Sequence, residues 1–167
     1  MGAHPYYYFT GYREDVNDAL QALRKAEFAA GRYDPAMQAY DDSYMFEFQF
    51  PPDIDSVAPG AQHSSIEEAF EASDASGTGS ILDIQEVSAN PQFLRSSPLS
   101  SEWLIRLFGT DKPTHELVKR VICDEEPLDG SDDLWDELTI GRGESRHLVV
   151  YTDGKPSEIF FMGYSVD

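Results

Sequence analysis

The sequence predicts an α+β fold in a single domain that spans residues 1–167. Segments typical of strands occur at both ends and in the middle, with helical patterns between them. A hydrophobic content of 41% over 167 residues is enough for one core, which would bury roughly 70% of the unfolded surface. Asp153-Gly154, between two apolar segments, indicates a C-terminal β-hairpin and disfavours an all-parallel sheet. We therefore expect a mixed or mainly antiparallel sheet of about five strands, with three to four helices packed on one face.

The N-terminal part is predicted to begin with a strand and a helix. Residues 5–12 are rich in aromatic side chains, which suits a strand. Residues 13–30 carry apolar side chains 3.6 positions apart, which predicts a helix. Gly31 is expected to end this helix, and Pro35 prevents its continuation. Residues 43–50 alternate aromatic and other side chains, a period of two that predicts the next strand.

The middle of the chain is predicted to hold a short helix and another strand. Residues 64–73 begin with two overlapping capping boxes, formed by Ser64 with Glu67 and by Ser65 with Glu68, which predicts a helix start. After a turn, residues 80–87 are expected to form a strand whose apolar side chains face the core.

The C-terminal part is predicted to hold two helices and the hairpin. Ser100 is a suitable N-cap for a helix that runs to Phe108 and ends at Gly109. A second helix is expected over residues 113–123, and a single helical turn near residues 134–138. Residues 147–152 and 158–164 then form the two strands of the hairpin.

Acidic residues are concentrated in two blocks that contain no lysine or arginine. Residues 33–94 hold twelve acids and residues 124–137 hold eight, and together they account for nearly all of the net charge of −19. Such blocks repel nucleic acid and anionic membranes, and they attract cations or basic proteins. The same bias also serves solubility or adaptation to salt, in which case the acids would be scattered over all faces.

Several features indicate a cytoplasmic protein. The first twelve residues have neither the basic nor the apolar region of a signal peptide, and the longest apolar runs are too short to span a bilayer. Cys123 is the only cysteine, which excludes an intrachain disulfide and fits a reducing compartment. These features leave the oligomeric state open.

Oxygen-bearing side chains recur at alternate positions after Asp74, and this spacing resembles an EF-hand calcium loop. The resemblance implies the following ligands: Asp74, Ser76, Thr78, Ser80 (through its carbonyl) and Gln85. The twelfth position is Gln85 instead of a bidentate glutamate, so one carboxylate would face the ion. We therefore expect a plain helix-to-strand turn and no cofactor, with weak calcium binding as the alternative.

No motif assigns a catalytic residue. His115-Glu116 begins like a zinc-protease helix, but Lys119 stands where the second histidine would be. Cys123 is followed by acids that would raise its pKa, which favours a structural thiol. The chain is therefore not expected to be an enzyme, although a carboxylate and histidine site assembled in space stays an alternative.

The combination of acid and aromatic residues favours a binding role. Alternate residues of the strand 5–12 point to opposite faces, so some of its aromatic side chains meet a second layer, a partner or a pocket. An aromatic surface beside acids attracts cationic groups. We therefore expect an acidic protein-binding module, of inhibitor or immunity type, that recognises a basic partner.

Overall fold

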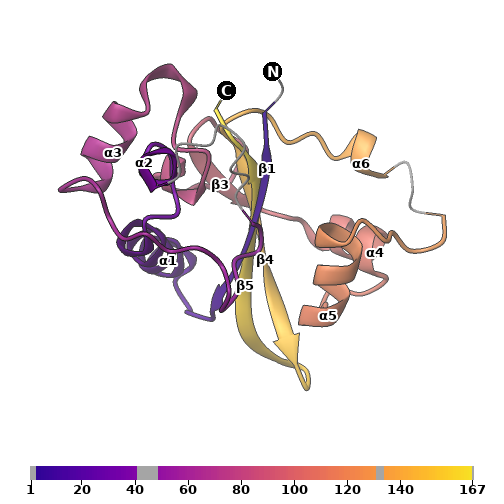
Figure 1. Cartoon of the computed structure of the whole chain (residues 1–167). Helices are drawn as coiled ribbons and strands as arrows, with labels where there is room; N and C mark the ends of the chain where they lie inside the picture. Colours follow the sequence, from indigo (N-terminus) through magenta and orange to yellow (C-terminus); the bar gives the residue numbers. More distant parts are fainter. Residues whose placement is uncertain (1–2, 41–48, 131–133, 167) are drawn as a thin grey trace.

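A five-stranded mixed sheet forms the centre of the molecule, in the order β1-β5-β4-β3-β2. The computed structural model describes residues 3–40, 49–130 and 134–166. The strands are β1 (Pro5–Gly11), β2 (Glu86–Val87), β3 (Arg95–Pro98), β4 (Ser145–Thr152) and β5 (Lys155–Tyr164). β5 is antiparallel to β1 and β4, whereas β3 is parallel to β2 and β4. The predicted α+β fold, the mixed sheet and the C-terminal hairpin are confirmed (Figure 1).

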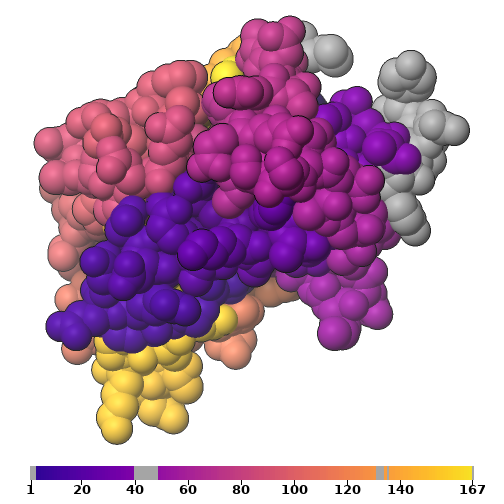
Figure 2. All heavy atoms as spheres, turned by 90° about the vertical axis from the view of Figure 1, so that its left-hand side faces the viewer, coloured from indigo at the N-terminus to yellow at the C-terminus, as the bar shows by residue number. Residues whose placement is uncertain are grey.

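Helices cover both faces of this sheet (Figure 1). The helices are α1 (Val16–Ala30), α2 (Ala36–Tyr40), α3 (Ile66–Ala72), α4 (Ser101–Phe108), α5 (His115–Val118) and α6 (Leu134–Glu137), with single turns η1 (Asp74–Ser76), η2 (Ile81–Asp83) and the π-helical η3 (Lys119–Cys123). The first three lie on one side and the last three on the other. Figure 2 shows α1 and α3 on the first side, with the β4–β5 hairpin projecting beyond α1.

The expectation of helices on one face only is wrong, because β1 and β5 are apolar on both faces. Tyr6 and Tyr8 are buried in a core with α1. Tyr7 and Phe9, which point the other way, pack on a second core with α4, α5 and η3. Alternation along a strand thus places aromatic side chains in both layers.

The helix ends follow from local chemistry. Asp15 accepts a hydrogen bond from the amide of Asn17 at 2.8 Å, so α1 begins at Val16 rather than at Arg13. Gly31 ends α1 at a φ of +76°. Ser65 and Ser100 cap α3 and α4 as predicted, each accepting from the amide three residues later.

One strand prediction did not hold as made, a second is not tested, and a further strand was missed. Residues 80–87 form η2 and the short β2 instead of one strand, because side-chain hydrogen bonds of Ser80 and Asp83 compete with a strand ladder. The predicted strand 43–50 lies almost wholly outside the described residues. β3 has the sequence RSSP, which carries no apolar pattern.

Within the described ranges, every helix falls short of the length and apolar character that crossing a bilayer requires.

Candidate functional site

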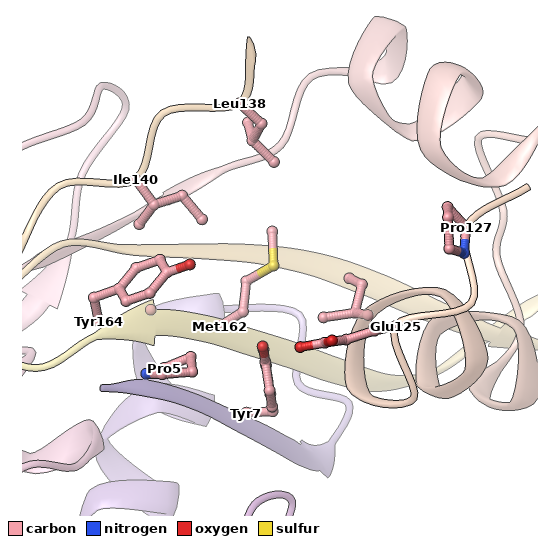
Figure 3. A pocket seen from close by; sticks show the side chains of 10 residues that line it. Pro5, Tyr7, Glu125, Pro127, Leu138, Ile140, Met162 and Tyr164 are labelled. Carbon is pink, nitrogen blue, oxygen red and sulfur yellow. The ribbon is translucent and has the colours of Figure 1, made fainter. Parts of the chain in front are cut away.

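A pocket of about 350 Å³ opens where β1, β5, the end of η3 and the chain before β4 meet (Figure 3). Its lining residues are Pro5, Tyr7, Ile122, Glu125, Pro127, Leu138, Ile140, Met162, Gly163 and Tyr164. Ligand pockets in proteins fall in the range of about 300 to 1,000 Å³. This pocket is therefore large enough for one long side chain or a small ligand.

The floor of the pocket follows from the register between β1 and β5. Pro5 pairs with Tyr164 and Tyr7 pairs with Met162, and residues directly opposite each other share a face of the sheet. Gly163 lies between the two β5 residues, and a Cβ added there would come within 2.6 Å of the Glu144 carbonyl oxygen. The floor is thus closely packed and in a defined position.

The wall that carries Leu138 and Ile140 is held by a buried arginine. The Arg146 guanidinium donates to the carbonyl of Thr139 at 3.1 Å and to the carboxylate of Glu144 at 3.3 Å. The same Glu144 oxygen accepts from the amide of Gly141. These bonds tie the chain before β4 to the sheet.

Glu125 enters the pocket from the end of η3 in an unusual backbone conformation. The amides of Asp124 and Glu126 donate to the carbonyls of Lys119 and Arg120, which ends the helix. Glu125 between them has a φ of +53°. This left-handed position at a helix end is usually glycine, because a Cβ costs roughly 1 kcal/mol there. In Figure 3 the Glu125 carboxylate and the Tyr7 hydroxyl point toward one another.

The pocket is aromatic and negatively charged. Burial, together with Tyr164, Cys123 and Glu125, raises the pKa of Tyr7 to about 12, so its hydroxyl stays neutral. Among the lining residues that the structure describes, Glu125 is the one charged side chain, and it is exposed. It takes part in no ion pair within the described part of the chain. A cation placed here would meet a carboxylate and two tyrosine rings.

The residues predicted to bind calcium divide into two groups. Thr78 and Ser80 are fully buried: the Thr78 hydroxyl donates to the Asp83 carboxylate at 2.6 Å and lies 2.9 Å from the Ser80 hydroxyl. Asp74, Ser76 and Gln85 are exposed. Over the ranges described, no three His, Cys, Asp or Glu side chains gather closely enough to hold a metal. The expectation of a plain turn, and weak calcium binding as its alternative, both stay predictions.

His115, His147 and Cys123 lie outside the pocket lining. His115 Nδ1 lies 2.8 Å from Glu158 Oε2, and its ring stacks on Phe9. His147 Nδ1 lies 3.0 Å from the Ser96 hydroxyl in the protein interior. Burial and the nearby Asp124 raise the pKa of Cys123 to about 12, so the thiol stays protonated.

Sequence patterns indicated two of the segments that line this pocket, but they did not predict that these segments lie side by side in the fold. The aromatic strand 5–12 and the acid block 124–137 were each recognised, whereas no pattern marked Tyr164, Gly163 or the residues before β4 as part of a site. The left-handed Glu125 also had no signal, because glutamate is not a residue that marks such a position. No protein-family model, curated protein or solved structure matches this chain.

Proposed function

We propose that this chain is a protein-binding module that takes a lysine or arginine side chain of a basic partner into the pocket. The observation that carries the proposal is the joining of Tyr7, Tyr164 and Glu125 around a space lined by no basic residue. Such a module can act as an inhibitor or immunity-type protein by covering the cationic surface of an enzyme or toxin. The lone, half-buried Cys123 fits action in the cytoplasm.

The pocket matches the two parts of a long basic side chain. Its apolar lining, which includes Leu138, Ile140 and Met162, suits a methylene stem. The tyrosine rings suit the charged head through cation–π attraction, which contributes about 0.5 to 2 kcal/mol. Glu125 can form an ion pair with the same charge. The fit therefore favours a long basic side chain over a neutral one.

The acid around the pocket supports the same partner. Glu126 and Asp129 are exposed on the segment that follows η3 and make no ion pair within the described ranges. Together with the net charge of −19, they would draw a basic protein toward this side of the molecule. Association should therefore weaken as salt rises from about 0.05 to about 0.5 M, where screening shortens the reach of exposed charges.

Selection of random displayed peptides on the purified chain tests the proposal. We expect the enriched peptides to share a lysine or arginine, and Glu125→Gln to weaken their binding by about tenfold or more, because a charge-assisted contact in the pocket is lost. Fluorescence anisotropy with the labelled peptides gives the affinities.

Glu126→Gln is the matched control, because it removes the same charge from the next residue, which does not line the pocket. Binding by this variant should fall only slightly. Equal losses in the two variants would mean that general charge, and not the pocket, recognises the peptide. Enriched peptides without basic residues would overturn the proposal.

A second substitution at Glu125 separates binding from folding. Glu125→Gly should raise the free energy of unfolding by roughly 1 kcal/mol, because glycine adopts the left-handed conformation without strain, while peptide binding is lost. Urea denaturation and anisotropy measure the two effects. A variant that is less stable than the parent would show that the Glu125 side chain supports the fold, and the argument from its strained backbone would fail.

A further inference from the structure

The outer edge of β1 offers backbone groups that are unpaired among the residues described by the structure. Pairing with β5 uses the even residues of β1 and its flanks: Ser165 donates to the His4 carbonyl, and Tyr12 donates to the Ser157 carbonyl. Tyr164 donates to Glu144, which confirms that the even residues of β5 face β4. Because bonding alternates along an antiparallel strand, the odd residues of β1 point their N–H and C=O groups away from β5.

These outward groups have no acceptor or strand beside them in the part of the chain that the structure describes. β1 is the last strand of the sheet, and the amides of Tyr7, Phe9 and Gly11 donate to no acceptor in residues 3–40, 49–130 and 134–166. Folded proteins usually protect such edges with charged side chains, prolines or very short strands.

The two edges of the sheet differ in this protection. β2, at the opposite edge, has two residues, and its Glu86 forms an ion pair with Arg95. β1 has seven residues with the sequence PYYYFTG, which holds no charged side chain and a single proline at its start. β1 is therefore the edge that can accept another strand.

We propose that an extended segment of the basic partner adds to the sheet along β1, with its basic side chain in the Tyr7–Tyr164–Glu125 pocket. This inference rests on the proposed function and gives the form in which the partner binds. Addition of a strand to a free edge is a common mode of peptide recognition, in which the main chain supplies affinity and alternate side chains supply specificity.

The free edge and the pocket belong to the same residues. Pro5 and Tyr7 line the pocket, and the backbone groups of both lie on the open edge. Side chains on neighbouring strands lie about 4.5 to 5.5 Å apart at Cβ when they face each other. A lysine or arginine opposite Tyr7 therefore has the reach to place its charge beside Glu125.

The next side chain on the same face of the added strand would lie near Phe9. Phe9 packs on Phe160 with ring centroids 4.7 Å apart and stacks on His115. Residues two apart in a strand share a face. The peptide should therefore carry a basic residue and an apolar or aromatic residue two positions apart.

Charge favours a basic partner over a second copy of this chain at the same edge. Two copies would each bring a net charge of −19 and the same acid block to the contact, and would repel each other. A lysine- or arginine-bearing segment gains from that charge instead.

N-methylation of the selected peptide, one residue at a time, tests the inference. In an added strand every second N–H points to β1, so methylation should weaken binding by about tenfold at alternate residues and leave the residues between them unaffected. Amide hydrogen exchange of the chain gives an independent readout. Binding should slow exchange at Tyr7 and Phe9, while Tyr8, which bonds within the β1–β5 ladder, is protected with or without peptide.

The outcomes separate the inference from the proposed function. A basic peptide that needs Glu125 but shows no period of two, and leaves the Tyr7 and Phe9 amides unchanged, would overturn strand addition and leave the function standing. Failure to select any basic peptide would overturn both. A third outcome would show that a second copy of the chain occupies the edge. In that case the Tyr7 and Phe9 amides would be protected without peptide, the protection would rise with protein concentration, and sedimentation would detect a dimer.

Discussion

Replacing Gly31 by alanine should lower the free energy of unfolding by roughly 2 to 5 kcal/mol. Gly31 ends α1 with a φ of +76°, where a side chain costs roughly 1 to 2 kcal/mol. An added Cβ would also overlap the backbone of Gly60. The Gly60 amide donates a hydrogen bond to the Ala30 carbonyl at 2.8 Å, which holds Gly60 beside the end of α1. Such overpacking adds about 1 to 3 kcal/mol. Urea denaturation followed by circular dichroism measures the loss.

Gly154→Ala is the matched control for this prediction. Gly154 has a φ of +74° in the hairpin turn, and nothing lies within 4 Å of a Cβ built there. This variant should therefore lose only the conformational part, about 1 to 2 kcal/mol. Equal losses at the two positions would show that the approach of Gly60 contributes nothing.

Acid should destabilise the fold through His147. Burial and the neighbouring Arg146 lower the pKa of His147 from 6.5 to about 4. In the unfolded chain the imidazole takes up a proton below its ordinary pKa of about 6.5, whereas in the fold it stays neutral until about pH 4. The neutral His147 imidazole makes its full contribution to the free energy of unfolding above pH 6.5. This contribution, about 3 kcal/mol in total, is lost as the pH falls to 4.

His147→Asn isolates this effect from the carboxylates that titrate in the same range. An asparagine amide has a polar atom in the position of Nδ1, which lies 3.0 Å from the Ser96 hydroxyl. Unfolding free energies from pH 7 to pH 4 should fall by about 3 kcal/mol more in the parent than in the variant. Parallel profiles would contradict a buried neutral imidazole at this position.

The proposed function links the surface charge to one place on the fold. Twenty acids fill the two base-free blocks, and among those that the structure describes Glu125 alone lines the pocket. Two others in the second block are neutralised by bases, Asp124 by Lys119 and Glu137 by Arg106. In the proposed function, the other exposed acids would act at a distance, as a field that attracts a basic partner, while Glu125 would make the specific contact.

Elements with strong local signals could be predicted from the sequence. The spacing of apolar residues predicts α1, which is present. The dipeptide Asp153-Gly154 between two apolar segments predicts the β4–β5 hairpin, which is also present. Asp153 and Gly154 have φ angles of +52° and +74°, as such a turn requires. Ser65 and Ser100 cap the helices that follow them for reasons contained within three residues.

Elements that depend on distant partners could not be predicted. β3 is a strand because its backbone pairs with β4, some 49 residues later, since Ser96 lies opposite Ser145. Its buried serines give no period of two. The helices were predicted, but their division between two faces was missed for a related reason: both faces of β1 are aromatic, and a strand pattern alone does not show how many layers cover it.

The amino-acid order alone determines the helix starts and stops, the hairpin turn, the acidic blocks and the aromatic character of β1, because each depends on residues a few positions apart or on composition. The pocket and the open strand edge arise only in the folded chain. Tyr7 and Glu125 are far apart in the sequence and meet because β1 pairs with β5 and η3 packs on the same face. Long-range packing, which no local pattern records, decides which of the many acids and aromatic residues form a site.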